Sequence, residues 1–427
     1  MANGPSLHAD ESFALQADAA DPLRRFRDQF HIPTDANGRP MIYFCGHSLG
    51  LQPRAVRALV DEELEEWARL GVEGHFRGKT PWYSYHEQLA EPGARLVGAR
   101  PGEVVFMNSL TVNLHLLMAT FFRPAGERKH ILTDAPTFPS DRYALQSQLR
   151  HPRLDPGGLL LLAKPREGEE TIRADDIDRI LEECGQGFAL VMMNGVNFLT
   201  GQWYDLPRIA ASAKRQGCIV GLDLAHAVGN VPLQLHDWGV DFAVWCTYKY
   251  MNCGPGAVGG CFVHEMHGRN LDLPRLAGWW GNDPATRFRM HMELEFVPQP
   301  GAAGWQVSNP PILSMAPLRA SLALFDEAGM PALRAKSERL TGYLHFLLDR
   351  ISGQPFEIIT PRDPVQRGCQ LSIVVHDRPR ELLAELEAQG VICDFREPNV
   401  IRVAPVPLYN TFHEVWRFAR ILANREH

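Results

Sequence analysis

Apolar runs and amphipathic segments alternate along the middle of the chain, between about residues 100 and 250. Short runs without a breaker, rich in β-branched and aromatic residues, predict buried strands at 103–107, 130–133, 188–193, 218–222 and 240–245. Between them, apolar residues recur at helical spacing at 112–122, 173–183 and 207–216. Strands and helices that alternate at this spacing predict an α/β fold, with a mainly parallel central sheet and helices on both faces.

The pattern changes on both sides of that region. Residues 1–40 are mostly polar and are predicted to form an N-terminal arm that packs with a small domain. The large domain is predicted to span 41–310, where Pro310-Pro311 marks a break. Long helices, short strands and a terminal helix then predict a smaller α+β C-terminal domain at 311–427.

Composition narrows the classes of protein that fit this pattern. A chain of 427 residues, 45% hydrophobic and 22% charged, is long enough for two packed domains. The net charge of −7 gives no basic surface for nucleic acid, and no apolar run is long enough to cross a membrane. We therefore expect neither a nucleic-acid partner nor a membrane partner.

The eight cysteines form no C-x-x-C pair and no regular spacing, which predicts reduced, mostly buried thiols and no metal site. The first ten residues lack the charged and apolar pattern of a secretion signal. Both observations favour a cytoplasmic protein.

Polar residues follow several of the predicted strands. In parallel sheets, ligands bind at the carboxyl ends of the strands, where the loops of neighbouring strands meet. The residues at these ends are Asn108 to Thr111, Phe138 to Asp141, Asn194, Asp223 and Lys249. Their position predicts a ligand site at that edge of the sheet.

Lys249 is the residue most suited to covalent chemistry. It follows a buried strand in Thr247-Tyr248-Lys249-Tyr250 and precedes a glycine-rich turn at 254–260, where the backbone is expected to stay loose. A lysine that is removed from water loses its proton readily and can then form a Schiff base. On this segment alone, a solvated lysine at a strand end is the commoner alternative.

A pyridoxal phosphate site needs such an amine and, near it, a carboxylate that keeps the pyridine nitrogen of the cofactor protonated. Asp223 ends a buried strand 26 residues before Lys249 and suits this second role. Its alternative is a cap on the following segment. Together the two residues favour the cofactor interpretation.

The phosphate and the ring of that cofactor also have candidate partners. Leu110 and Thr111 lie where a strand turns into a helix, and free backbone N–H groups at such a turn bind phosphate. Tyr248 would add a hydroxyl, Phe138 would stack on the ring, and His226 would lie near its edge. The structural alternatives are helix capping by Ser109 or Thr111, a core phenylalanine and a histidine bound to a backbone carbonyl.

The acid, the later lysine and the upstream phosphate turn indicate the aspartate-aminotransferase-like (fold type I) class of pyridoxal phosphate enzymes. Further motifs lie at 44–53, Leu110-Thr111-Val112-Asn113-Leu114-His115, Phe138-Pro139-Ser140-Asp141, 221–230, 236–243, Tyr248-Lys249-Tyr250, Gly278-Trp279-Trp280-Gly281, Val307-Ser308-Asn309-Pro310-Pro311 and 402–410. In these motifs the chain resembles the kynureninase family, from about residue 40 to the C-terminus.

The resemblance implies a hydrolase that requires pyridoxal phosphate. Kynureninases cleave the Cβ–Cγ bond of L-kynurenine, or of 3-hydroxy-L-kynurenine, with water. The products are L-alanine and anthranilate or 3-hydroxyanthranilate, in tryptophan degradation and in NAD biosynthesis. The family also implies a homodimer with shared active sites.

The same resemblance implies roles for residues of this sequence. Lys249 would be the imine lysine and the acid and base of the reaction, with Asp223 as the pyridinium partner and Tyr248 as a candidate proton relay. Cofactor contacts would come from Leu110, Thr111, Phe138, Pro139, Ser140, Asp141, Asn194, His226 and Tyr248, and from Trp279 and Asn309 of a neighbouring subunit. Substrate contacts would come from Ser48, His75, Asn309 and Arg402, the last pairing with the substrate carboxylate.

Two positions depart from the family pattern. Asn194 stands where a serine is common, and Trp280 stands where phenylalanine is often seen. Ser48, His75 and Asn309, in contrast, match positions that line the aryl side in animal-type enzymes. A preference for 3-hydroxykynurenine is therefore a hypothesis.

Two other functions stay open. Another fold type I enzyme, such as a cysteine desulfurase or an aminotransferase, would share the cofactor residues. A desulfurase needs an exposed, activated cysteine, and the only candidate, Cys369, lies where a strand begins. An inactive cofactor-bound scaffold is disfavoured by Lys249, Asp223 and Arg402, although Arg402 alone would suggest a surface arginine at a strand end.

Overall fold

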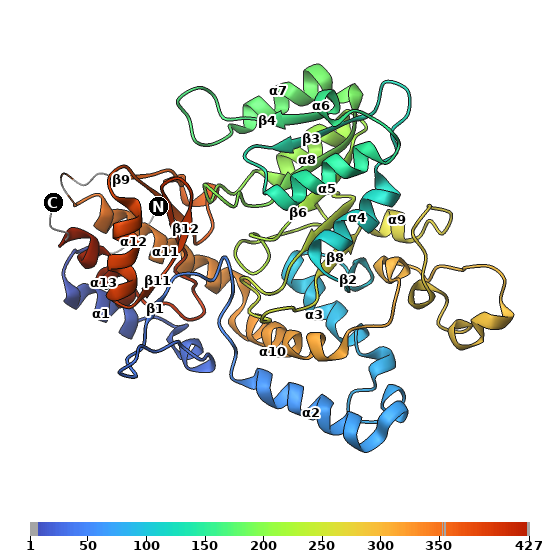
Figure 1. Ribbon diagram of the computed structural model, residues 1–427, viewed down its shortest axis with the longest axis horizontal. Helices are drawn as coiled ribbons and strands as arrows, with labels where there is room; N and C mark the ends of the chain where they lie inside the picture. The colour runs from blue at the N-terminus through green and yellow to red at the C-terminus, as the bar shows by residue number, and fades with distance from the viewer. Residues whose placement is uncertain (1–6, 352, 354–355, 425–427) are drawn as a thin grey trace.

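The computed structural model describes residues 7–351, 353 and 356–424, so the first six residues of the predicted arm lie outside the described part. Figure 1 shows a larger lobe built around one sheet, and a smaller lobe that combines the first helix with the C-terminal elements. Each lobe has its own hydrophobic core. None of the helices in the described ranges is long and apolar enough to span a membrane.

Seven strands form the central sheet of the larger lobe. In spatial order they are β2 (Val104–Phe106), β8 (Gly260–Val263), β7 (Phe242–Trp245), β6 (Ile219–Asp223), β5 (Phe188–Asn194), β3 (His130–Asp134) and β4 (Leu160–Ala163). The strands from β7 to β4 are parallel, whereas β8 runs antiparallel to both of its neighbours. The predicted α/β fold with a mainly parallel sheet is confirmed.

Helices cover both faces of this sheet. They are α3 (Glu87–Val97), α4 (Leu110–Phe121), α5 (Pro139–Arg150), α6 (Pro156–Leu159), α7 (Ala174–Cys184), α8 (Leu206–Arg215), α9 (Glu265–Gly268) and α10 (Ile312–Ala328). A further helix, α2 (Ala55–Leu70), packs against α10. Leu190 and Met192 of β5 share a core with α4 and α5, whereas Val191 and Met193 share another with α7 and α8. Because both faces are covered, the strand is apolar from Phe188 to Met193.

The glycine-rich stretch after Lys249 is more ordered than predicted. Gly260 begins β8 and pairs with Trp245 of β7. A Cβ atom at position 260 would lie 2.2 Å from the Trp245 ring, so glycine is needed for this close packing. The expectation of a loose backbone at Gly260 was therefore wrong, because the glycine accommodates a large buried side chain.

The smaller lobe combines an antiparallel sheet with helices from both ends of the described chain. The sheet order is β12 (Asp394–Arg396), β13 (Val400–Val403), β10 (Leu371–Val375) and β9 (Phe356–Ile358). The helices are α1 (Glu11–Ala19), α11 (Met330–Leu348), α12 (Pro379–Ala388) and α13 (Phe412–Ala423), with α1 against α13. β1 (Ile42–Tyr43) pairs in parallel with β11 (Val391–Ile392). The domain boundaries at residues 40 and 310 stay predictions.

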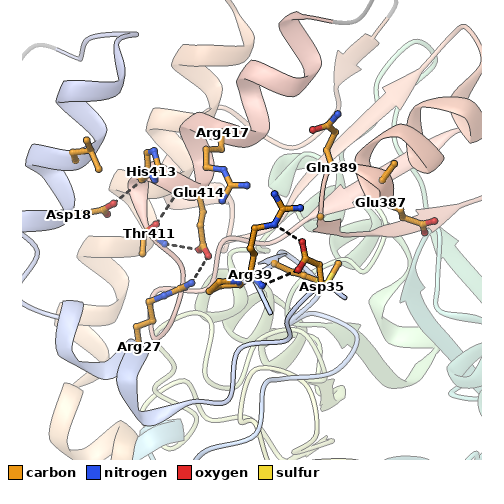
Figure 2. A pocket seen from close by; sticks show the side chains of 15 residues that line it. Asp18, Arg27, Asp35, Arg39, Glu387, Gln389, Thr411, His413, Glu414 and Arg417 are labelled. Carbon is orange, nitrogen blue, oxygen red and sulfur yellow. Dashed lines mark hydrogen bonds and ion pairs between the residues drawn. The ribbon is translucent and has the colours of Figure 1, made fainter. Parts of the chain in front are cut away.

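A cavity of about 570 Å³ lies between the N-terminal segment and the smaller lobe (Figure 2). Charged side chains line it, and several of them are paired with one another. Arg27 contacts Glu414 at 2.7 Å, and Arg39 contacts Asp35 at 2.8 Å. The cavity has neither a lysine nor a strand end of the central sheet, so it is not the predicted cofactor site.

A buried ion pair fixes the N-terminal segment to α11. The Asp21 carboxylate lies 2.7 Å from Nζ of Lys336, and both side chains are almost completely buried. We expect Asp21→Asn to lower the free energy of unfolding by about 3 kcal/mol, because it leaves a buried charge without its partner. Urea unfolding measures this change.

The matched control is Glu327→Gln, which breaks the exposed pair between Arg25 and Glu327. This control should cost less than about 1 kcal/mol. Equal and small effects of the two substitutions would show that the buried pair does not hold the N-terminal segment.

Candidate active site

The ends of neighbouring strands meet at one edge of the central sheet, as predicted. In the sheet register, Asn194 of β5 pairs with Asp223 of β6, and Asp223 pairs with Val244 of β7. Asp134 ends β3, the next strand beyond β5. Lys249 follows β7, so the lysine and Asp223 come to this edge from adjacent strands.

Lys249 is half-buried, and its amine has two aromatic neighbours. Nζ lies 2.9 Å from Nε2 of His226 and 5.8 Å from the centre of the Phe138 ring. His226 is buried, and its pKa lies well below the ordinary value because burial, and then the Lys249 charge, disfavour the imidazolium. A neutral Nε2 can accept a hydrogen bond from the amine.

Two carboxyl groups lie next to each other beside this lysine. Asp223 accepts a hydrogen bond from the backbone N–H of Ala225 at 2.7 Å, and Asp141 on α5 contacts the Asp223 carboxyl. Burial raises the pKa of Asp223 to about 6. Burial and the Asp223 charge raise the pKa of Asp141 well above its ordinary value. Two buried acids of this kind favour a cationic partner, and a pyridinium nitrogen is such a partner.

The first turns of α4 and α5 lie close together. Thr111 Oγ1 on α4 is 3.1 Å from Ser140 Oγ on α5, and Leu110 and Pro139 are the first residues of the two helices. Among the described residues no side chain caps either helix, so the alternative of capping by Ser109 or Thr111 is not seen. Free N–H groups and hydroxyls at two helix starts are suited to bind phosphate.

Asn194 points into a separate polar network. Its backbone N–H and its side-chain amide both donate to Asp134 Oδ1, at 3.0 and 2.8 Å. Asn197 and Tyr204 donate to the other oxygen of Asp134 at 3.2 and 3.1 Å. Burial raises the pKa of Asp134 despite these donors. Asn194 thus supports the ends of β3 and β5, behind the Asp223 pair.

The loop at 45–50 links the Lys249 turn to the smaller lobe. At one end Cys45 forms a parallel bridge with Ala404. At the other end the Gly50 N–H donates to the Tyr248 carbonyl at 2.8 Å. A Cβ atom at position 50 would lie 2.2 Å from the Lys249 carbonyl oxygen, so only glycine fits this approach.

Arg402 is buried rather than a surface residue. Its Nε and Nη2 atoms lie 2.9 and 2.7 Å from Asp394 Oδ1, and Nη1 donates to the Phe198 carbonyl at 2.6 Å. Ser48 Oγ donates to the other oxygen of Asp394 at 2.9 Å, and Arg396 Nη2 does so at 3.2 Å. Ser48 and Arg402, predicted for the substrate, are therefore brought together through Asp394.

Asp394 was missed in the sequence. A usable signal was present, because Asp394-Phe395-Arg396 lies directly before the strand that carries Arg402. A buried arginine requires a carboxylate partner. The signal depends, however, on knowing that Arg402 is buried.

His75, Trp279 and Asn309 are not part of this cluster within the chain. His75 packs edge-on to Trp82 at 5.3 Å, and Trp279 packs edge-on to Trp280 at 4.8 Å. Asn309 is exposed. Trp280 is buried, and the Arg287 guanidinium lies 4.5 Å from its ring centre, so the departure from phenylalanine fills a packed position.

The residues at the sheet edge fit pyridoxal phosphate. Lys249 and Asp223 offer an amine and a carboxylate, and the starts of α4 and α5 offer N–H and hydroxyl donors that would suit the phosphate. Phe138 lies over the lysine amine, where the cofactor ring would stack. Nδ1 of the buried His226 has no hydrogen-bond partner among the described residues, as expected of a side chain that meets a ligand. The Tyr248 hydroxyl lies by the Cys246 thiol, at the same edge.

Comparison with known proteins gives matches over nearly the whole chain. Residues 333–422 match the family described as "Kynureninase C-terminal domain". A kynureninase of Myxococcus xanthus (strain DK1622) is 57% identical over 419 residues, which cover 98% of each chain. A kynureninase of Koribacter versatilis (strain Ellin345) is 54% identical over 415 residues, which cover 97% of each chain.

Two solved structures share the fold. An apo cysteine desulfurase of Thermococcus onnurineus NA1 has a TM-score of 0.73 at 18% identity, covering 90% of this chain and 94% of its own. A C-DES variant with glycine covalently linked to its PLP cofactor has a TM-score of 0.77 at 18% identity, covering 94% and 99%. The predicted fold type I class is confirmed by these neighbours.

The approach of Gly50 to the Lys249 turn is directly testable. We expect Gly50→Ala to weaken the binding of pyridoxal phosphate and to lower the free energy of unfolding by about 1–3 kcal/mol, because a backbone oxygen must move. Titration of the cofactor by absorbance and urea unfolding measure the two effects.

Gly342→Ala on α11 is the control, because an added Cβ atom there meets nothing within 4 Å. It should leave cofactor binding unchanged and change the stability by less than about 1 kcal/mol. Unchanged cofactor affinity in Gly50→Ala would contradict the importance of this contact.

Proposed function

The chain belongs to the kynureninase family, and from that premise we propose that it hydrolyses L-kynurenine, 3-hydroxy-L-kynurenine or both with bound pyridoxal phosphate. The products are L-alanine and anthranilate or 3-hydroxyanthranilate. The observation that carries this proposal is the identity of 57% over nearly the whole chain. It agrees with a lysine, a carboxyl pair and two helix starts at one sheet edge.

We assign the cofactor contacts as follows. Lys249 would hold the aldehyde, Asp223 would hold the proton on the ring nitrogen, and Phe138 would stack on the ring. Phosphate donors would be Leu110, Thr111, Ser140 and Tyr248. Pro139, Asp141 and His226 would line the same site, and Asn194 would support it from behind through its hydrogen bond to Asp134. The chemistry that bound pyridoxal phosphate supplies is withdrawal of electrons from the substrate α-carbon.

Lys249 and Tyr248 would move protons at the substrate. Lys249, once its amine is free, would remove the proton from the α-carbon, and His226 would orient that amine by accepting its hydrogen bond at 2.9 Å. Burial raises the pKa of Tyr248, so its hydroxyl keeps its proton and can serve as a donor. We propose that Tyr248 is the proton relay when water adds to the ketone and the Cβ–Cγ bond breaks.

Different residues would bind the carboxylate and the aryl ring of the substrate. Arg402 would pair with the α-carboxylate, and its Asp394 partner keeps the guanidinium in place. Ser48, His75 and Asn309 would line the aryl side, which favours 3-hydroxykynurenine. The ratio of kcat/KM for the two substrates measures this preference.

We also propose a homodimer in which Trp279 and Asn309 complete the partner's site. Large apolar side chains are exposed on the segment that carries Trp279, as on surfaces that meet another protein. They are Leu276, Phe288, Met290, Met292, Leu294 and Val297. The location we propose is cytoplasmic, which agrees with the absence of a disulfide among the described cysteines.

A cysteine desulfurase is the main alternative, since desulfurases share this fold. That activity requires an accessible thiolate. Cys369 is fully buried, and burial raises its pKa to about 12. Cys369 therefore does not suit the role.

The reaction itself is tested with purified protein, pyridoxal phosphate and either substrate. We expect a yellow protein that releases alanine and the aryl acid in equal amounts. Lys249→Ala should lose at least about 1,000-fold in kcat, because no other amine replaces it. Lys79→Ala, at an exposed ion pair with Glu62, is the control and should keep full activity.

A yellow protein that is inert toward both substrates would refute the proposed reaction, but it would not refute the binding of pyridoxal phosphate. Repeated turnover by Lys249→Ala would refute the role of the lysine.

A further inference from the structure

His47 is a buried histidine without a partner. Its side chain has no exposed surface, and neither ring nitrogen has a hydrogen-bond partner among the described residues. Buried polar groups in this state are uncommon, because burial without a hydrogen bond costs free energy. The imidazole therefore marks a place where a ligand can supply the missing partner.

The loop at 45–50, which carries His47, contacts two charged centres. Its neighbour Ser48 donates to Asp394, the partner of Arg402, and Gly50 contacts the Lys249 turn. Burial lowers the pKa of His47 well below its ordinary value, and the positive charges of Arg402 and Lys249 lower it further. The imidazole is therefore neutral, and the charges of the arginine and the lysine both act on it.

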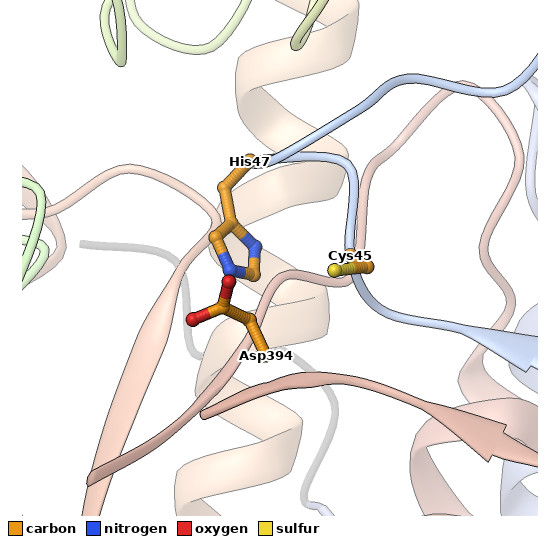
Figure 3. Close-up of side chains that lie close together, drawn as sticks. All are labelled: Cys45, His47 and Asp394. Atoms are coloured by element: carbon orange, nitrogen blue, oxygen red, sulfur yellow. The ribbon is translucent and has the colours of Figure 1, made fainter. Parts of the chain in front are cut away.

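A metal ion is one ligand to weigh, because Cys45, His47 and Asp394 offer ligand atoms within 4.8 Å of one another (Figure 3). Two observations disfavour it. Asp394 is already paired with Arg402 and Arg396. Burial and the Asp394 charge also raise the pKa of Cys45, so the thiol keeps its proton. The charges of Arg402, Lys249 and Arg396 all act on His47, so its surroundings suit an anion.

We propose that His47 donates a hydrogen bond to the α-carboxylate of the amino-acid substrate, as a second donor beside Arg402. This inference rests on the proposed function, because it assumes that an amino-acid substrate lies between Lys249 and Arg402. Such a ligand has its amine at one end and its carboxylate at the other, and a ring nitrogen of His47 lies within 4.8 Å of the Asp394 carboxylate that pairs with Arg402. A neutral imidazole has one N–H donor, so it binds the carboxylate without adding a further positive charge.

The test compares two small amines that differ in the carboxylate. L-Alanine, the proposed product, has the amine and the carboxylate, whereas ethylamine lacks the carboxylate. Their dissociation constants are measured on the pyridoxal phosphate-loaded protein, by its absorption change and by calorimetry. The variants are His47→Phe, which keeps a ring without nitrogens, and His47→Gln, which keeps an N–H donor.

We expect His47→Phe to raise the dissociation constant of alanine about tenfold and that of ethylamine less than about twofold. His47→Gln should stay within about threefold of the parent for alanine. The control is His345→Phe, because His345 on α11 is also buried with both ring nitrogens unpartnered among the described residues. It should leave both constants unchanged.

Unchanged alanine binding in His47→Phe would overturn the proposal, and so would equal weakening of alanine and ethylamine. The experiments distinguish a failure of the proposed reaction from a failure of the proposed role of His47. A parent protein that binds alanine in a His47-dependent way but does not cleave kynurenine refutes the reaction alone. A parent that cleaves kynurenine, with alanine binding unaffected by His47→Phe, refutes the role of His47 alone.

Discussion

A lysine amine and two acidic side chains are held together in a largely buried sheet edge, and the rest of the site depends on this arrangement. Burial raises the pKa of Asp223 and Asp141, so keeping both ionised without a cation costs free energy. The hydrogen bond from Ala225 and the charge of Lys249 offset only part of that cost. A cofactor with a protonated ring nitrogen would supply a further cation. The same cofactor carries a phosphate that suits the helix starts at Thr111 and Ser140.

The two lobes contribute different halves of the site. The larger lobe provides the strand ends and helix starts around Lys249, which suit the cofactor. The smaller lobe provides Arg402 and Asp394, which suit the carboxylate of a substrate. The loop at 45–50 joins them, because it bridges to Ala404 at one end and contacts the Lys249 turn at the other. Any shift between the lobes would therefore change the distance between the lysine and the arginine.

Local patterns in the sequence predicted the parts of the site that depend on neighbouring residues. The apolar strands and their polar ends gave the sheet edge, and the spacing of Asp223 and Lys249 followed from adjacent strands. Contacts between distant segments were not predictable in this way. The pairing of Asp394 with Arg402 and the hydrogen bond from Asn194 to Asp134 depend on tertiary structure. The same holds for the burial of His47, because a histidine in a small-residue loop gives no sign of its depth.

The most direct test of this account is a crystal structure of the protein with pyridoxal phosphate. We expect continuous electron density between Lys249 Nζ and the aldehyde carbon of the cofactor. We also expect an Asp223 oxygen within about 3 Å of the ring nitrogen, and the phosphate at the starts of α4 and α5. A cofactor joined to another lysine, or a ring nitrogen that faces away from Asp223, would contradict the account.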